Sequence, residues 1–133
     1  MLPPQKHPFV TVDGIVLVGG KVVAVVRRND PFRGMPALPG GFIELGERAE
    51  DAVVREVCEE TGLETKVRRV VGVYSDPSRD PRGHVIAIVF ELDRIGGELR
   101  ASSDAADVRL LDPDVLPPLA FDHARILADW RKG

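Results

Sequence analysis

Three glutamates at close spacing carry the clearest chemical signal in this 133-residue chain: Glu56, Glu59 and Glu60. The stretch from 47 to 61 has no Gly or Pro and carries acids at its start, so it is predicted to be a helix that ends at Gly62. At about 100° per residue the three carboxylates fall on one side of that helix. They repel one another, and only Arg55 is close enough to offset them. Such a cluster either faces solvent or binds a hard cation such as Mg²⁺ or Mn²⁺.

The residues around this cluster decide between the two alternatives. Residues 41–63 read Gly-x5-Glu-x7-Arg-Glu-Val-x-Glu-Glu-x-Gly-Leu, which resembles the signature of the Nudix hydrolases at every defined position. The resemblance implies an α/β/α sandwich with a mixed β-sheet, which holds divalent metals against a nucleoside diphosphate linked to another group. It also implies the site residues. The metal ligands would be the carbonyl of Gly40 and the side chains of Glu56, Glu59 and Glu60. The catalytic residues would be Glu56 and Glu60 together with Arg55 and its partner Glu47.

The elements that must position this helix follow from pattern. Two β-branched runs around Gly19-Gly20 predict a hairpin, and a loop leads from there to a glycine turn at Gly40-Gly41, where backbone can approach a ligand closely. A turn is expected at 95–99 and a helical turn from Asp112. The further strands and the last helix are expected at 66–74, 83–92, 108–111 and from Phe121 onward.

The segment 75–84 is the second candidate for function. It looks like the Ser-Asp-Pro-x-Arg-Asp-Pro-Arg segment of the ADP-ribose pyrophosphatase branch, and Pro77 stands fifteen residues after Gly62, where that branch has a proline. Arg79 and Arg82 are then candidates to bind phosphate or ribose oxygens, since guanidinium groups make bidentate contacts. The alternative is a proline-rich surface connection between two strands.

The acceptor of the proton from the attacking water is left open. Glu56 is one candidate, and a carboxylate of the acidic stretch 102–107, Asp104 or Asp107, is the other. Asp104 could instead cap a turn. A base contributes on the order of 10²- to 10⁴-fold to the rate, whereas a cap contributes stability.

Composition bounds the remaining possibilities. The length predicts a single domain over 1–133, and a net charge of −3 without a basic cluster argues against a nucleic-acid partner. No apolar segment predicts a signal peptide or a membrane partner, so a cytoplasmic location is expected. The single cysteine, Cys58, is expected to be buried and inert. The apolar side of the last helix, with Trp130, is core or a homodimer contact.

The predicted function is metal-dependent hydrolysis of ADP-ribose to AMP and ribose 5-phosphate, with Mg²⁺ or Mn²⁺ as cofactor and the nucleotide as small-molecule partner. One alternative keeps the chemistry and changes the substrate to a (d)NTP or another nucleotide. Another is a non-catalytic domain that senses a nucleotide. Sensor versions usually lose carboxylates of the signature or carry an added DNA-binding domain, and this sequence shows neither feature.

Overall fold

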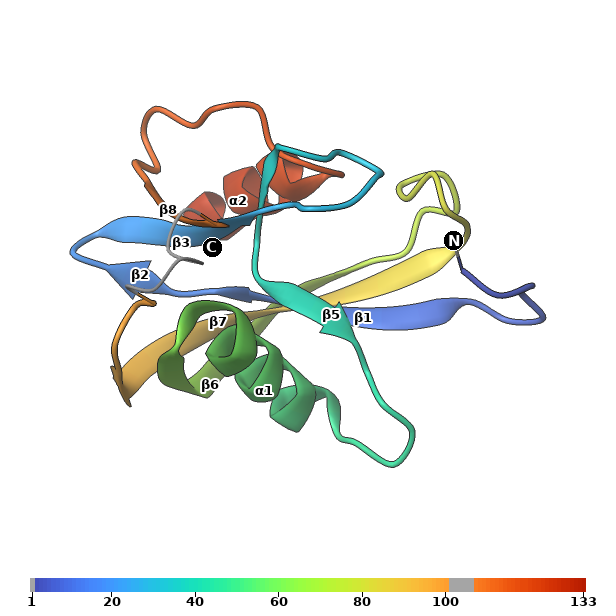
Figure 1. Cartoon of the computed structure of the whole chain (residues 1–133), viewed down its shortest axis with the longest axis horizontal. Helices are drawn as coiled ribbons and strands as arrows, with labels where there is room; N and C mark the ends of the chain where they lie inside the picture. Colours follow the sequence, from blue (N-terminus) through green and yellow to red (C-terminus); the bar gives the residue numbers. More distant parts are fainter. Residues whose placement is uncertain (1, 101–106) are drawn as a thin grey trace.

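The computed structural model describes residues 2–100 and 107–133, which form an α/β/α arrangement (Figure 1). The strands lie between α1 and α2, which cover opposite sides. The elements are β1 (Phe9–Ile15), β2 (Leu17–Val18), β3 (Lys21–Val26), β4 (Pro36–Ala37), β5 (Gly40–Phe42), α1 (Ala49–Thr61), β6 (Leu63–Tyr74), β7 (Val85–Gly97), β8 (Val108–Leu111) and α2 (His123–Lys132).

The strands form two sheets, and both contribute residues to the site described below. The first has the order β5-β1-β7-β6, with β1 parallel to β7 and the other pairs antiparallel. The second has the order β2-β3-β4, and β8 pairs with β3. The predicted α/β class with a mixed sheet is therefore confirmed.

The predicted hairpin is correct only near its turn. β2 and β3 pair around Gly19-Gly20, but β1 pairs with β5 and β7 in the other sheet. The chain changes sheets at Val16, whose carbonyl accepts a hydrogen bond from the backbone N–H of Val23. Local propensity predicts an extended chain on both sides of Val16 but does not choose the partner strand.

Two hydrophobic clusters hold the layers together. One packs α1 onto the first sheet, and the other packs α2 onto the opposite side. The first contains Val12, Val53, Val57, Leu63 and Phe90; the second contains Ile15, Leu38, Val89, Ile126 and Leu127. Trp130 lies partly buried against the second cluster, and its Nε1 donates to Glu91 at 2.8 Å, so this side of α2 is core.

The signature helix has nearly the predicted bounds. It begins at Ala49 and ends at Thr61, and the following Gly62 adopts the left-handed conformation (φ 85°) expected of a C-terminal glycine. The expectation for Cys58 is wrong, because its side chain is exposed. Val57 points into the core, and the next residue is rotated by about 100°, which brings Cys58 out of the apolar stripe.

Two other expectations also need correction. The turn predicted at 95–99 begins later, because β7 continues to Gly97 along its partner β6. The segment from Asp112 forms a turn rather than a helix. In the described part of the chain, neither helix has the length and apolar character needed to cross a membrane.

Candidate active site

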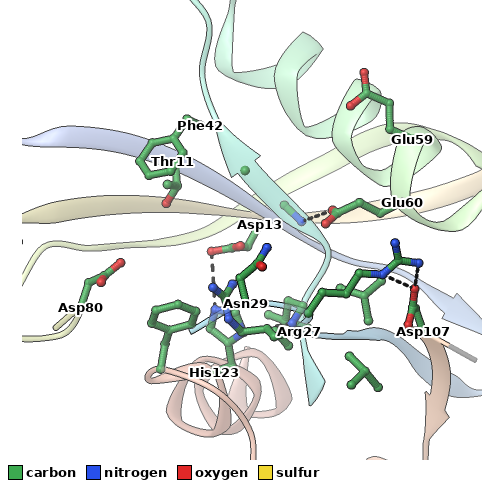
Figure 2. A pocket seen from close by; sticks show the side chains of 18 of the residues that line it. Thr11, Asp13, Arg27, Asn29, Phe42, Glu59, Glu60, Asp80, Asp107 and His123 are labelled. Carbon is green, nitrogen blue, oxygen red and sulfur yellow. Dashed lines mark hydrogen bonds and ion pairs between the residues drawn. The ribbon is translucent and has the colours of Figure 1, made fainter. Parts of the chain in front are cut away.

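A cavity of about 560 Å³ opens at the end of the strands, and most of the predicted site residues border it (Figure 2). Its lining comes from β1, β3, β5, the C-terminal half of α1, the 75–84 loop and the start of α2. A volume of this size falls in the range of small-molecule sites. The polar residues that line it include Asp13, Arg27, Arg28, Glu59, Glu60, Arg79, Asp80, Arg82, Asp107 and His123.

We call Glu56, Glu59 and Glu60 the acidic wall. Glu60 reaches across to β5, where its Oε2 accepts the backbone N–H of Gly40 at 2.7 Å. Glu56 lies against Gly41, and a Cβ added to Gly41 would stand 2.6 Å from the Glu56 carboxyl carbon. Gly41 is thus required because any side chain there would displace the carboxylate.

Arg55 organises the acidic wall from its outer side. Its Nε and Nη2 donate to the two oxygens of Glu47 at 2.7 and 3.0 Å, which is a bidentate pair. Its Nη1 donates to Glu56 at 2.8 Å and to Glu59 at 3.3 Å. The pairing of Arg55 with Glu47 expected from the resemblance is present, and it lowers the pKa of Glu47. Arg55 therefore ties the loop before α1 to the carboxylates of the helix.

The acidic wall carries more negative charge than its neighbours offset. Burial, together with repulsion by Glu56, Asp13 and Glu59, raises the pKa of Glu60 to about 8, although the bond from Gly40 opposes the shift. Burial also raises the pKa of Glu56. A cation placed here would relieve this repulsion, and carboxylate oxygens are the donors that Mg²⁺ and Mn²⁺ prefer. The residues present therefore fit a divalent metal.

The carboxylates do not converge on one point. Among the described residues, no three His, Cys, Asp or Glu side chains come together at metal-binding spacing. Glu60 bonds to Gly40, whereas Glu56 and Glu59 share Arg55. The side chain of Glu59 is largely exposed and points away from Glu60 in Figure 2. Mutual repulsion between carboxylates favours such a spread arrangement.

We call Arg27, Arg79 and Arg82 the basic wall. Arg82 is held by the buried Asp80, which accepts its Nη2 at 2.8 Å and its Nε at 3.1 Å. Its guanidinium lies 5.5 Å from the ring centroids of both Phe42 and Phe121, and Arg27 lies 4.9 Å from that of Phe121. Aromatic faces stabilise cations in this position. Two guanidinium groups are thus fixed around one ring at the edge of the cavity.

Arg79 joins the 75–84 loop to the start of α2. It donates to both oxygens of Asp122, at 2.6 and 2.9 Å, and its side chain is only 6% exposed. The pair raises the pKa of Arg79 and lowers that of Asp122, in both cases against the effect of burial. The side chain of Asp122 therefore binds Arg79 of the 75–84 loop and does not cap α2.

The structure brings together only part of the predicted set. Gly40, Glu59, Glu60, Arg79, Arg82 and Asp107 line the cavity. Pro77 is exposed and does not line it, and Glu47, Arg55 and Glu56 lie behind the lining residues rather than among them. Asp107 forms an ion pair with Arg28, and Asp104 lies outside the described residues.

The lining residues that sequence reasoning did not name as candidates include Asp13, Arg27, Phe121 and His123. Asp13 could have been found from the sequence, because a carboxylate inside an otherwise apolar strand is rarely buried without a binding or catalytic role. Phe121 has a positive φ of 54°, a backbone conformation that no sequence pattern here predicts. Arg27 and His123 look like ordinary residues at the ends of their elements.

Comparison with known proteins agrees with this geometry. The model of the NUDIX domain family matches residues 7–130. An ADP-ribose pyrophosphatase of Methanocaldococcus jannaschii is 56% identical over 130 residues, covering 96% of this chain and 77% of that protein.

Two solved structures share the fold. The NUDIX domain of Shewanella oneidensis NrtR, complexed with ADP ribose, has a TM-score of 0.76 at 29% identity and covers 96% of this chain and 89% of that one. A bifunctional NMN adenylyltransferase/ADP ribose pyrophosphatase from Francisella tularensis, complexed with AMP and a Mn ion, has a TM-score of 0.74 at 28% identity. The match covers 98% of this chain but 43% of that longer one. The family match spans nearly all of the described residues and includes the acidic wall, so this chain belongs to the NUDIX domain family.

Proposed function

We propose that this protein hydrolyses the pyrophosphate bond of ADP-ribose, giving AMP and ribose 5-phosphate, in a reaction that depends on a divalent metal. The observation that carries the proposal is the cavity, where a carboxylate cluster short of positive charge meets a preorganised set of arginines. The 56% identity to a protein named as an ADP-ribose pyrophosphatase supports the choice of substrate.

The Gly40 carbonyl, Glu56, Glu59 and Glu60 would hold Mg²⁺ or Mn²⁺. A bound divalent cation would lower the pKa of the attacking water and neutralise charge on the phosphates. The Mn ion in the Francisella tularensis structure and the oxygen donors of the acidic wall support this assignment. Arg55 keeps Glu56 in position, and Glu47 in turn fixes the guanidinium of Arg55.

Arg82 is the residue of the basic wall best placed to bind the substrate. Asp80 and two phenyl rings already fix its guanidinium, so binding an anion there costs little conformational entropy. Arg79 is committed to Asp122, and we assign it the role of holding the loop that presents Arg82. Pro77 would act only through the shape of that loop.

The proton acceptor is assigned by comparing three variants at saturating metal: Glu56→Gln, Asp104→Asn and Asp107→Asn. Loss of more than about a hundredfold in kcat in one aspartate variant, with unchanged melting temperature, would place the base there. Near-normal rates in both would return the role to Glu56 or to hydroxide without a separate base. Because Asp107 pairs with Arg28, an Arg28→Gln variant serves as the control for loss of the ion pair alone.

A substrate panel tests the proposal. Hydrolysis of ADP-ribose, ADP-glucose, NADH, FAD, GTP, 8-oxo-dGTP and diadenosine polyphosphates is measured with Mg²⁺ and with Mn²⁺, and products are identified by chromatography. ADP-ribose is expected to have the highest kcat/KM. A triphosphate that exceeds it by more than tenfold would favour the (d)NTP alternative, and tight binding of ADP-ribose without turnover would favour a sensor.

Three further predictions accompany this proposal. We expect a cytoplasmic location, no nucleic-acid or membrane partner, and either a monomer or a homodimer. Cell fractionation checks the first prediction. Retention on immobilised nucleic acid and on lipid vesicles checks the second, and light scattering of the purified protein checks the third.

A further inference from the structure

Asp13 and His123 form a second polar cluster on the lining of the cavity, contributed by β1 and the start of α2 (Figure 2). Both are buried, with 7% and 3% of their surface exposed. The Asp13 carboxylate accepts no hydrogen bond from any residue in the described ranges, and its Oδ2 lies 3.8 Å from Nε2 of His123. A buried carboxylate that lines a cavity without a hydrogen bond is costly, so its role is expected to lie with a ligand.

The backbone fixes the proton position on His123. Its Nδ1 accepts the backbone N–H of Leu38 at 3.0 Å, and an amide N–H can only donate. The proton of the neutral ring therefore sits on Nε2, which faces Oδ2 of Asp13 at 3.8 Å. This distance exceeds a hydrogen bond, and an oxygen about 2.8 Å from both atoms fits between them.

One acceptor beside one donor is a specific chemical pattern. A hydroxyl group can donate to Asp13 and accept from Nε2 of His123 at the same time. A phosphate would be repelled by the carboxylate, and an ammonium group would meet the N–H of His123. Asp13 also lies beside the acidic wall. It pairs with Gly40 in the register of β1 and β5, and the N–H of Gly40 donates to Glu60.

We propose that Asp13 and His123 form a subsite for a sugar hydroxyl of the substrate, next to the pyrophosphate. This inference rests on the proposed function, since it assigns specificity within the same cavity. A site with two buried polar groups rejects a ligand that lacks the hydroxyl, because both groups are then left unpaired. The subsite thus selects a nucleoside diphosphate sugar with that hydroxyl over the deoxy form.

Binding of product-like ligands tests this without requiring turnover. Calorimetry compares AMP with 2′-deoxy-AMP and 3′-deoxy-AMP, and ribose 5-phosphate with its 2-deoxy and 3-deoxy forms. In the wild type, one deoxy ligand is expected to bind roughly tenfold to a hundredfold more weakly than its parent. In Asp13→Ala this ratio should shrink to within about threefold, because the partner of the hydroxyl is gone.

His123 offers a matched pair of variants. His123→Asn keeps an acceptor for the N–H of Leu38 but removes Nε2, so it should lose the discrimination. His123→Gln places an amide N–H near the position of Nε2 and should retain part of it. Asp93→Asn, at a half-buried position of β7 that does not line the cavity, is the control for the chemical change and should behave like the wild type.

Three outcomes would overturn the proposal: no deoxy ligand binds more weakly than its parent in the wild type, the discrimination persists in both Asp13→Ala and His123→Asn, or no ligand of either series binds. Equal binding of parent and deoxy ligands would indicate that the pair holds only water. These readings are independent of the substrate panel. Failure to hydrolyse ADP-ribose, with the discrimination intact, would overturn the proposed function alone.

Discussion

The acidic wall and the basic wall of the cavity are built on different principles. Glu56, Glu59 and Glu60 come from two turns of one helix, and Arg55 forms hydrogen bonds with Glu56 and Glu59. Arg27, Arg79 and Arg82 come from two segments far apart in the sequence, and each contacts an aromatic ring or an aspartate. The acidic wall therefore carries an excess of negative charge, whereas the arginines of the basic wall are already held in place.

This difference assigns separate tasks to the two sides. The repulsion in the acidic wall raises the pKa of Glu60 to about 8, and a divalent cation is the natural way to relieve it. The basic wall has its geometry fixed in advance, which suits recognition of the substrate. Variants of the acidic wall should thus lower catalytic rate, and variants of the basic wall should lower stability or affinity.

The largest expected effect concerns the anchor of the basic wall. Asp122→Asn removes the carboxylate that is paired with the buried charge of Arg79, which should cost about 3–5 kcal/mol of unfolding free energy. The double variant Arg79→Met with Asp122→Leu should recover most of this loss, since no charge remains buried. Urea unfolding monitored by circular dichroism measures both.

The exposed pair Arg131 and Asp114 provides the control for that prediction. Asp114→Asn should change stability by less than about 1 kcal/mol, because exposed ion pairs contribute little. If Asp122→Asn is as mild as Asp114→Asn, the buried pair does not anchor the loop.

The next effect concerns the acidic wall. Glu60→Gln keeps the shape of the side chain and an acceptor for the N–H of Gly40, but it removes the charge of a proposed metal ligand. Activity should fall by roughly a hundredfold or more, while the melting temperature without metal stays equal or rises as repulsion is relieved. Kinetics and thermal melting with and without Mg²⁺ measure this.

Metal linkage separates this mechanism from a structural defect. Wild type should gain melting temperature on addition of Mg²⁺, and Glu60→Gln should gain much less. Glu50→Gln, an exposed acid on the first turn of the same helix, is the matched control and should behave like the wild type. Full activity of Glu60→Gln, or of the wild type in excess EDTA, would rule out the metal mechanism.

A smaller effect is expected for Arg82. Arg82→Lys keeps the charge but cannot reproduce the two side-chain bonds to Asp80, so the cation is no longer held between the rings. KM should rise roughly tenfold with little change in kcat, since the contact proposed for Arg82 would be made equally in the substrate complex and in the transition state. Arg94→Lys, an exposed arginine on β7, is the control. A fall in kcat at unchanged KM would argue against a binding role.

The smallest effect is a pH dependence of stability at His123. Burial lowers the pKa of His123 from 6.5 to about 4, so the unfolded chain binds its proton first. The stability from the neutral ring is present above pH 6.5 and is lost as the pH falls toward 4, by roughly 1 kcal/mol between pH 7 and 5.5. Urea unfolding at the two pH values measures this loss.

The groups that face His123 are Asp13, Arg27, Arg79 and Asp122, and the experiment must allow for them. Burial raises the pKa of Asp13 to about 7, so its contribution has the opposite sign and is lost as the pH rises from 3.8. The prediction is therefore a difference: His123→Gln should lose less stability than the wild type between pH 7 and 5.5, and His7→Gln should match the wild type. Identical losses in His123→Gln and wild type would contradict it.

The sequence by itself determined the features that depend on near neighbours. The signature helix, its left-handed Gly62 and the grouping of Glu56, Glu59 and Glu60 follow from helical periodicity and end signals. The bounds of β8 were also correct, because a short β-branched and leucine-rich run is bordered by turn residues. These properties are set within one or two turns of chain, where spacing translates directly into geometry.

Only the tertiary structure decided which of these pieces meet. It placed the change of sheets at Val16, exposed Cys58, and committed Arg79 to Asp122. It also brought Asp13 and His123, which lie far apart in the sequence, to 3.8 Å from one another. Such contacts depend on sheet order, on helix packing and on the positive φ of Phe121. These features depend on packing between segments that are distant in the sequence, so no local pattern of residues predicts them.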